Sequence, residues 1–361
     1  MSSYLNIHVL HPSPMANLNR DDTGAPKSLV YGGVSRARWS SQSLKRAARV
    51  AFEAANVGDR TIRSKSNSAL VVEKAVALLE AAGESVDEDL RAALTKKANS
   101  KTNALVAKDA AKADTLVWLA ERELDDIAAG IAGVGDEATV SSATSSLSIA
   151  AFGRMFANAP AQQTEAAIQV AHAFTVNAAN MDVDYFTAVD DLGALSGHAG
   201  AGHLEVAPYT SGVYYRYLNV DRNQLLRNWD VDPTDPHTTE RLAALVRTLV
   251  LSLPTGKLNS TAAHTPPAHV VFHVSGTPAS LAPAFEATVP ATQDGYLAGA
   301  IGQFDTYWAA LEQMYPGLLG EKLVASLRAP GAAPLGDLID AATSWMLTGA
   351  PLTPPAEAAA R

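Results

Sequence analysis

The sequence predicts an α+β fold, in which a ferredoxin-like sheet is interrupted by a helical insertion. Three observations lead to this prediction. Residues 4–10 alternate between apolar and other side chains, which is typical of a strand with one face on a core. A long stretch rich in Ala, Lys and Glu follows the first strand and helix. Strand patterns then return at 167–176, 213–220 and 269–275.

The elements before the insertion follow from local patterns. Residues 4–10 place their apolar side chains on one face, so we expect a half-buried strand. A loop rich in Pro, Asn and Asp comes next and ends at Gly32-Gly33. Ser40 or Ser41 is then a suitable N-cap for a helix that runs to about residue 56.

The remaining elements are predicted with the same rules. Residues 61–130 read as wholly helical, and strand-like sequence resumes at 147–156. Residues 238–253 carry apolar side chains at helical spacing, which predicts a strongly amphipathic helix. The C-terminal stretch is expected to be helical and interrupted by prolines, with a frayed end.

Composition excludes several classes of protein. The chain has 361 residues, of which 47% are hydrophobic and 18% are charged, as in globular domains. It has no cysteine, which excludes disulfides and thiolate metal sites. The N-terminal residues do not resemble a signal peptide, and no apolar stretch reaches the roughly 18 residues of a membrane span. We therefore expect a cytoplasmic protein without membrane contact.

Charge is distributed unevenly along the chain. The formal net charge is −9, which by itself argues against a nucleic-acid partner. Residues 1–101, however, hold 15 Lys/Arg and 10 Asp/Glu, whereas residues 102–361 hold 13 and 27. Between Thr23 and Phe52 there are six basic residues and no acidic one. A polyanion would be attracted to that local patch whatever the total charge.

The basic segment 36–49 carries the clearest functional pattern. Its serines stand where a helix begins, and the first N–H groups of a helix favour a phosphate. Lys45 and Arg49 are four residues apart, so they lie one turn apart on the same helix face. With Gln42 and Arg46 they form a ladder that could follow a phosphodiester backbone. The alternative is a solvated basic face of an ordinary helix.

Other candidate residues leave alternatives open. Asp21 and Asp22 are paired carboxylates that could serve a metal-dependent endoribonuclease, with His8 as a second candidate, although turn capping explains such a pair as well. Tyr185 and Phe186 could stack on bases or pack in a core. A further set of lysines decorates one helical region, either as a solubilising surface or as loose contacts to duplex DNA: Lys96, Lys97, Lys101, Lys108 and Lys112.

Several motifs, in order along the chain, resemble the CasC family, the backbone subunit of the type I-E CRISPR Cascade surveillance complex. The similar segments cover residues 4 to about 310. They are NIHVL at 6–10, LNRDD at 18–22, RARWSSQSLKRAAR at 36–49 after Gly32-Gly33, AFGRM at 151–155, VAHAF at 170–174, DYFTAVDD at 184–191, SGVYYRY at 211–217 and the GK turn within 254–263.

This resemblance implies a fold in three parts. An RRM-like palm would comprise residues 1–58, with the RNA-binding helix at 40–56, residues 136–180, and residues 224–361 with the C-terminal helices. A helical fingers insertion would occupy 59–135, and a β-hairpin thumb would occupy 181–223. Copies of such a subunit would polymerise along a CRISPR guide RNA, and each thumb would displace one nucleotide at regular intervals. The segments between kinks would pair with target DNA.

The resemblance also implies residue roles. Guide phosphates would be contacted by the helix start and its surroundings, and Met155 would pack against the displaced nucleotide. Tyr185, where the family commonly has Trp, would wedge the RNA together with Phe186 and Thr187. The full set of implied RNA-binding residues is Arg20, Arg38, Ser40, Gln42, Ser43, Lys45, Arg46, Arg49, Met155, Tyr185, Phe186, Thr187 and Lys257.

The expected function is therefore antiviral defence by a non-catalytic, homo-oligomeric scaffold that forms a helical filament. The expected partners are the guide RNA, target DNA, further copies of the chain and other Cascade subunits, with no metal and no other cofactor. Two alternatives remain open. One is the metal-dependent endoribonuclease using Asp21 or Asp22, and the other is an oligomeric scaffold that needs no nucleic acid.

Overall fold

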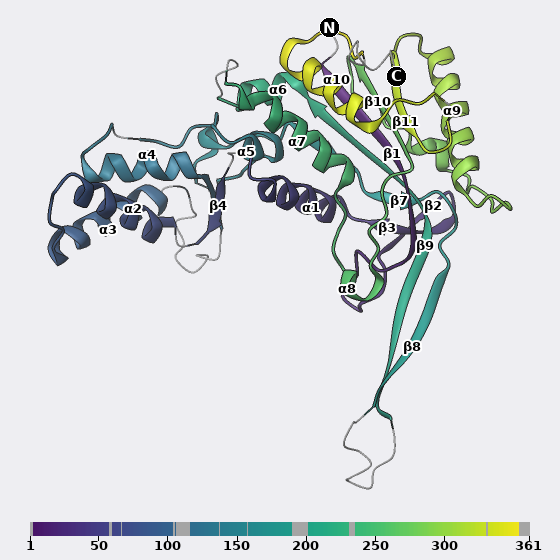
Figure 1. Ribbon diagram of the computed structural model, residues 1–361, viewed down its shortest axis with the longest axis horizontal. Helices are drawn as coiled ribbons and strands as arrows, with labels where there is room; N and C mark the ends of the chain where they lie inside the picture. Colours follow the sequence, from purple (N-terminus) through teal and green to yellow (C-terminus); the bar gives the residue numbers. More distant parts are fainter. Residues whose placement is uncertain are drawn as a thin grey trace. The chain divides into compact units, whose positions relative to one another are not determined.

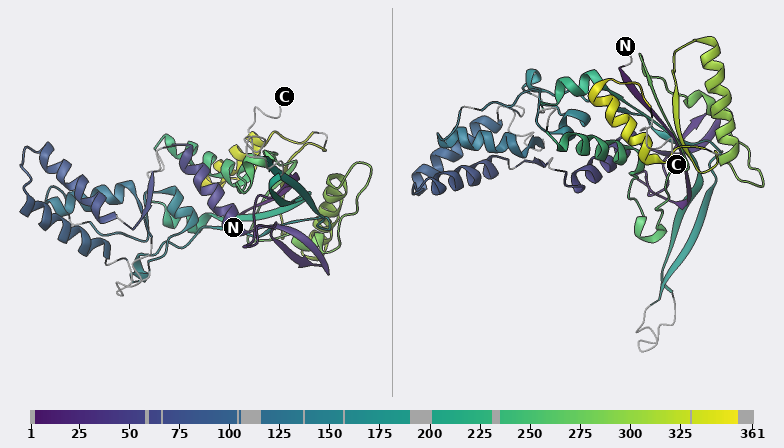
Figure 2. Two further views of the ribbon diagram at one scale, coloured as in Figure 1. Left: turned by 90° about the horizontal axis from the view of Figure 1, so that it is seen from below. Right: turned by 45° about the horizontal axis from the view of Figure 1, so that its top comes forward.

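The computed structural model describes residues 3–57, 60–65, 67–103, 105, 116–136, 138–156, 158–189, 201–230, 235–329 and 331–353. The chain divides into two compact units (Figures 1 and 2). The first comprises Met1–Ala48, Val170–Asn219 and Val246–Arg361, and the second comprises Arg49–Gln169 and Val220–Leu245. Within the described ranges, no helix is both long and apolar enough to cross a membrane.

An antiparallel β-sheet forms the centre of the first unit. Its strands are hydrogen-bonded in the order β11-β10-β1-β9-β7-β3-β2, with β6 and β8 also paired to β9. The strand bounds are β1 Tyr4–Ala16, β2 Ser28–Tyr31, β3 Val34–Trp39, β6 Ile168–Val170, β7 Ala173–Thr175, β8 Met181–Val189, β9 Ala201–Asp221, β10 His269–Ser275 and β11 Lys322–Ser326.

Helices cover both faces of this sheet. Helix α9 (Leu297–Met314) packs Phe304 and Trp308 on the face that carries His8, and η3 (Ala282–Phe285) joins the same apolar cluster. Helix α10 (Leu335–Thr348) contacts β10 and β11 and lies on the other side (Figure 2). The prediction of a half-buried strand at residues 4–10 was therefore wrong. The polar face of β1 is also buried, because α9 covers it.

The second unit is largely helical. Helices α2 (Asn67–Ala81), α3 (Glu88–Asn103) and α4 (Glu121–Ala132) share one core of small and branched apolar side chains. The expectation of uninterrupted helix from 61 to 130 was wrong. Strands β4 (Thr61–Ser64) and β5 (Val117–Ala120) pair in an antiparallel ribbon.

The segment after α4 also differs from expectation. Residues 147–156 were predicted as strand, but Leu147–Phe152 form helix α5, which begins because the Ser146 hydroxyl accepts a hydrogen bond from the Ile149 N–H. The 3-10 helix η2 (Pro160–Gln162) and helix α6 (Arg222–Asn228) complete the unit. The predicted strand at 167–176 is divided into β6 and β7.

Three helices remain, and two of them were predicted. Helix α1 spans Ser41–Ala54, and α7 spans His237–Leu251, close to the predicted limits. The short helix α8 (Leu258–Thr261) follows the predicted turn at residue 256. Helix α1, helix α7, β6 and β9 each contain residues of both units. The division into palm, fingers and thumb at the predicted boundaries stays a prediction.

Candidate nucleic-acid interface

The start of α1 is held by side chains from distant parts of the chain. Ser40 is the N-cap, because its hydroxyl accepts a hydrogen bond of 3.3 Å from the Ser43 N–H, and the Ser43 hydroxyl donates to the Ser40 carbonyl at 2.8 Å. The Ser40 N–H in turn donates to Asn19 Oδ1 at 2.7 Å. The LNRDD loop is thereby fixed against the helix start. The Ser40 side chain is buried, whereas Ser43 is half-buried.

His172 belongs to this interface, although the sequence analysis assigned it no role there. Its Nδ1 accepts hydrogen bonds from the Ser41 N–H at 2.9 Å and from Arg38 Nη1 at 3.4 Å. The imidazole must therefore carry its hydrogen on Nε2. Partial burial, together with the charges of Arg38 and Lys27, lowers the pKa of His172. The exposed ring thus covers an otherwise free helix N–H group.

The four members of the predicted ladder are in different environments. Gln42 and Arg46 are exposed, and Lys45 is half-buried, with its pKa lowered by burial. Among the described residues, none forms a hydrogen bond or ion pair with the Lys45 ammonium. Lys45 is therefore a cation whose burial cost a bound anion would offset.

Arg49 is instead occupied by neighbours within the second unit. Its Nη1 lies 3.0 Å from each carboxylate oxygen of Glu53, and its guanidinium lies 5.3 Å from the centre of the Trp118 ring. Only 17% of the Arg49 side chain is exposed. A phosphate contact by Arg49 would have to share the guanidinium with Glu53, and this role stays a prediction.

Two loops adjoin the helix start. The carbonyl of Asn19 accepts the Lys27 N–H at 2.9 Å, and the Lys27 carbonyl accepts the Arg38 N–H at 2.7 Å, while Arg20 is exposed. Arg38 itself is half-buried and donates from Nε to Ser28 O at 3.4 Å. Asn19, which precedes Arg20, and Lys27 therefore link the predicted residue Arg38 to the loop that also holds the helix start.

The GK turn approaches the same loop. The Gly256 N–H donates to the Leu18 carbonyl at 3.0 Å, and a Cβ on Gly256 would lie only 2.5 Å from that oxygen, so only glycine fits. Lys257 follows in the left-handed conformation and is half-buried. Leu18, the start of α1 and the start of α8 share one apolar cluster, which includes Trp39 and Leu44. This cluster brings sequence-distant predicted residues together.

Arg36, the first residue of the basic segment 36–49, stabilises the fold and does not face solvent. Arg36 is fully buried, and burial lowers its pKa. Its guanidinium donates to four backbone carbonyls, those of Thr175, Val176, Phe285 and Glu286. It therefore ties β3 to the end of β7 and to η3, and it is not available to a polyanion.

The paired carboxylates are arranged as a turn. Asp21 Oδ1 accepts hydrogen bonds from the Thr23 hydroxyl at 2.7 Å, the Thr23 N–H at 2.9 Å and the Ala25 N–H at 3.0 Å. The Thr23 hydroxyl, followed by these N–H groups, lowers the pKa of Asp21. Asp22 is exposed. In the described part of the chain, His, Asp and Glu side chains form no group of three that could hold a metal ion. His8 is buried, and burial holds its pKa well below the usual value.

The hairpin of β8 and β9 exposes apolar side chains. Tyr185 is 67% exposed and Phe186 is 42% exposed, opposite Val206 and Glu205 on β9. Thr187 is also exposed. The two strands project from the sheet of the first unit (Figure 1). Exposed aromatic rings on a projecting ribbon are available for stacking, as a wedge would need.

Met155 is a second exposed apolar side chain, in the second unit. It is 76% exposed although it stands between two buried residues, Arg154 and Phe156. Of the lysines considered for DNA contact, Lys96 is exposed, and the Lys97 ammonium donates to the Ile131 carbonyl at 3.2 Å. Lys108 and Lys112 lie outside the described residues. A role for these lysines stays a prediction.

Comparisons with known proteins are consistent with the geometry. A family model described as CT1975-like protein matches residues 5–343. A solved chain described as "CRISPR RNA-guided surveillance complex, pre-nicking" has 30% sequence identity and a TM-score of 0.75, covering 95% of this chain and 100% of its own. A second, described as "CRISPR RNA-guided surveillance complex", has 27% identity and a TM-score of 0.61, covering 95% and 99%. No curated protein matches the sequence. The predicted α+β fold with an RRM-like palm is confirmed.

Proposed function

Because this chain belongs to the CT1975-like family, we propose that it is a CRISPR RNA-binding backbone subunit of a Cascade-type surveillance complex, of type I-E. Several copies polymerise along one guide RNA in a helical filament, together with other Cascade subunits. The complex then presents the guide for pairing with target DNA. Its role is antiviral defence in the cytoplasm.

The observation that carries this proposal is the organised start of α1. Ser40, Asn19 and His172 hold the first turn in place through hydrogen bonds within the chain itself. Arg38, Lys45 and Arg46 lie on or beside the same turn, and Lys45 is a half-buried cation. An ordered helix start with cations around it favours phosphate groups, because the helix dipole and the cations attract negative charge and binding need not order the site.

In this proposal the chain contacts the backbone of the guide RNA and not its bases. A scaffold for any spacer must bind phosphate and ribose and leave the base edges free for pairing. In the proposal, guide phosphates are contacted by the basic and polar residues around α1 and by the GK turn. They are Arg20, Arg38, Ser40, Gln42, Ser43, Lys45, Arg46, Arg49 and Lys257.

Periodic kinks are made by apolar side chains. Tyr185, Phe186 and Thr187 on the projecting hairpin wedge the RNA, and Met155 packs against the nucleotide that they displace. Both aromatic rings and Met155 are exposed, so these contacts require no unfolding of a core. Each kink ends one short segment of duplex, which limits how far guide and target must wind around each other.

The proposal is tested by purifying the chain from cells that transcribe a CRISPR array and sequencing any RNA that co-purifies. We expect RNA of defined length, protected from nuclease except at regularly spaced nucleotides. Equal assembly in the presence and absence of RNA, without protection, would instead identify an oligomeric scaffold independent of nucleic acid. Magnesium-dependent cleavage of a bound complementary RNA at regular spacing would identify the endoribonuclease alternative. An Asp21→Asn variant that abolished this cleavage would assign it to the loop.

A further inference from the structure

We propose that Arg154, through its ion pair with Glu123, is a positioning residue that presents Met155 to the displaced nucleotide of the guide. The inference rests on the proposed function, and it gives the second unit a direct part in forming the kink. Arg154 itself touches no RNA in this proposal. It acts by fixing the backbone from which Met155 projects.

The local chain alternates between buried and exposed side chains. The Arg154 side chain is 1% exposed, Met155 is 76% exposed and Phe156 is 2% exposed. The Arg154 guanidinium lies 5.0 Å from the centre of the Phe156 ring, so the two buried neighbours also contact each other. Met155 is therefore the outward point of a segment that is anchored on both sides.

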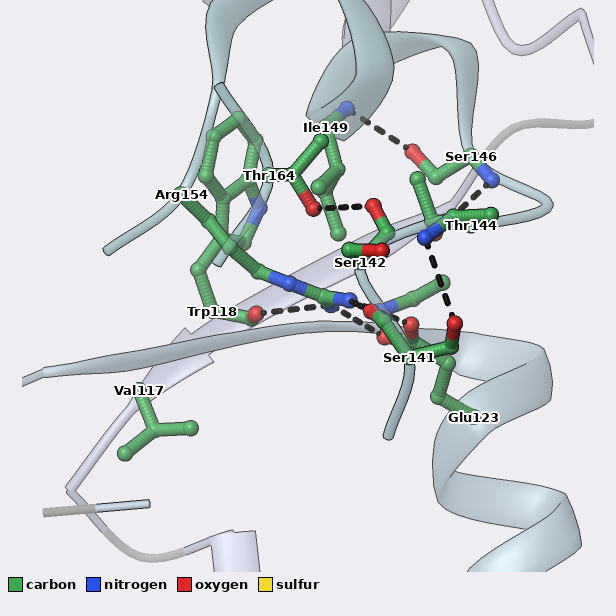
Figure 3. Close-up of polar contacts among 12 residues, drawn as sticks. Val117, Trp118, Glu123, Ser141, Ser142, Thr144, Ser146, Ile149, Arg154 and Thr164 are labelled. Atoms are coloured by element: carbon green, nitrogen blue, oxygen red, sulfur yellow. Dashed lines mark hydrogen bonds and ion pairs between the residues drawn. The ribbon is translucent and has the colours of Figure 1, made fainter. Parts of the chain in front are cut away.

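Charged hydrogen bonds form the anchor on the Arg154 side (Figure 3). Arg154 Nη1 and Nη2 donate to the two carboxylate oxygens of Glu123 at 2.5 and 2.8 Å. Nη2 also donates to the Ser141 carbonyl at 2.8 Å, and Nη1 lies 3.4 Å from the Trp118 carbonyl. A bidentate pair of this kind fixes orientation as well as distance.

The backbone around Arg154 is fixed independently. Its N–H and C=O exchange hydrogen bonds of 2.8 and 3.0 Å with Thr164, whose hydroxyl donates to the Ser142 carbonyl at 2.8 Å. Gly153 precedes it with a φ of 76°, and a Cβ there would lie 2.7 Å from the Ala166 nitrogen. The chain therefore has little freedom to redirect Met155.

Glu123 connects this anchor to the helical part of the second unit. Its Oε2 accepts the Ala120 N–H at 2.9 Å and so caps the start of α4. The same carboxylate thus sets where α4 begins and how Arg154 is held.

The physical gain from this arrangement is preorganisation. Methionine has three rotatable side-chain bonds and adapts to irregular apolar surfaces, but an exposed methionine on a mobile chain would lose much freedom on binding. A rigid backbone removes part of that loss. Met155 itself is 76% exposed and contributes little to folding, so in this proposal the anchor beneath it serves ligand contact as well as the fold.

A double-mutant cycle tests the inference. Wild type, Arg154→Lys, Met155→Ala and the double variant are assembled with one guide RNA. Chemical probing then measures the reactivity of each displaced nucleotide, and total RNA affinity is measured in parallel. We expect about a fivefold change in reactivity from each single variant, since ordering one side chain contributes this much. In the Met155→Ala background, Arg154→Lys should cause no further change in the reactivity of the displaced nucleotides.

Controls separate this result from general damage. Arg122→Lys alters an exposed arginine on the same helix as Glu123 and should leave the probing pattern unchanged. If Arg154→Lys does not fold, Glu123→Gln, which weakens the pair while keeping an acceptor, takes its place in the cycle. Equal effects of the anchor variant in both backgrounds would overturn the inference, as would an unchanged pattern in Met155→Ala. Failure of the wild type to bind RNA would instead refute the proposed function.

Discussion

Lys45 and Arg49 lie one helical turn apart on α1, yet their surroundings differ. Lys45 is a half-buried cation, and Arg49 is held by Glu53 and the Trp118 ring. A basic residue in a sequence pattern is therefore not automatically a free charge. We therefore expect Arg49 to contribute to stability and Lys45 to contribute to RNA binding.

Arg49→Ala is expected to lower the free energy of unfolding by roughly 1–2 kcal/mol, because Glu53 loses a charged hydrogen-bond partner. Lys45→Ala should leave that free energy nearly unchanged, since it removes a cation that burial already disfavours. Urea unfolding of both variants without RNA measures the difference. Equal destabilisation by the two substitutions would show that the partners of Arg49 contribute nothing specific.

His172→Ala should destabilise α1 by about 1 kcal/mol, since the Ser41 N–H loses its acceptor. His172→Asn should retain most of the stability, because the amide oxygen can occupy the place of Nδ1. His172→Gln, which mimics Nε2 instead, should behave like alanine. Thermal unfolding of the three variants distinguishes these cases, and an identical loss in all three would contradict the capping role.

The sequence could predict which residues start α1 but not what they contact. Ser40 as a candidate N-cap follows from local pattern, because a cap involves residues three apart. His172 lies 131 residues from Ser41, and a single histidine in an apolar segment gives no signal of such a contact. The Glu53 partner of Arg49 lies four residues on along α1, a spacing that the sequence displays, whereas the contact with Trp118 could not be predicted because that residue is distant in the chain.

Among the elements, the β1 and β10 pair carries a buried histidine network. The Leu281 N–H donates to the Tyr215 hydroxyl at 3.0 Å, which lies 2.9 Å from His8 Nδ1. His8 Nε2 lies 3.1 Å from His273 Nε2, and His273 Nδ1 lies 2.7 Å from the Leu319 carbonyl. Since the carbonyl only accepts, both rings are satisfied when neutral. Protonation of His273 would place its Nε2–H against the Nε2–H of His8, and protonation of His8 would remove the acceptor that its Nδ1 offers to the Tyr215 hydroxyl.

This network predicts a loss of stability in acid. Burial lowers the pKa of His273 to about 4, and that of His8 lies well below its usual value of 6.5. Below pH 6.5 the unfolded chain therefore binds protons that the folded chain does not, and stability falls as the pH falls toward 4. Each histidine contributes a slope of up to about 1.4 kcal/mol per pH unit.

Urea unfolding between pH 7.5 and pH 4.5 measures this slope, with His273→Gln as the comparison. The variant should show a shallower dependence, because one titrating group is removed. A pH dependence identical to that of the wild type would show that other groups cause the acid sensitivity.

For the hairpin of β8 and β9 we predict an effect on RNA and almost none on stability. Tyr185→Ala and Phe186→Ala should each change the free energy of unfolding by no more than about 0.5 kcal/mol, because both rings are exposed. In an assembled complex, however, each should alter the chemical reactivity of the displaced nucleotides. Met181→Ala, exposed on the same strand, is the matched control. Unaltered reactivity in the two aromatic variants would contradict the wedge.

Long elements with clear periodicity were predictable, and short ones were not. Helix α7 and strand β10 match their expected limits closely, since many residues support each pattern. Helix α5 has six residues in a run of small and apolar side chains that suits a strand equally well, and the Ser146 cap favours the helix. Strand β5 has four buried apolar residues and is specified by its partner β4.

At the scale of the whole molecule, the local charge around the start of α1 differs in sign from the total charge. The chain carries −9 overall, but the loop at Arg20, β3 and the start of α1 bring cations to one place in the first unit. The fold class was predictable from the order of strand and helix patterns. The division into two compact units could not be predicted, because it depends on packing between segments far apart in sequence.

The central claim is that cations around the start of α1 bind guide phosphates without reading bases. Its most direct test is the affinity of wild type and a Lys45→Ala, Arg46→Ala double variant for two guide RNAs of equal length and unrelated spacer, measured across salt concentrations. Arg328→Ala, an exposed cation next to β11, is the control. We predict the same loss of affinity for both guides and a shallower salt dependence, by about 0.7 per lost phosphate contact in the logarithmic slope. A loss confined to one guide, or a salt slope equal to that of the wild type, would contradict the claim.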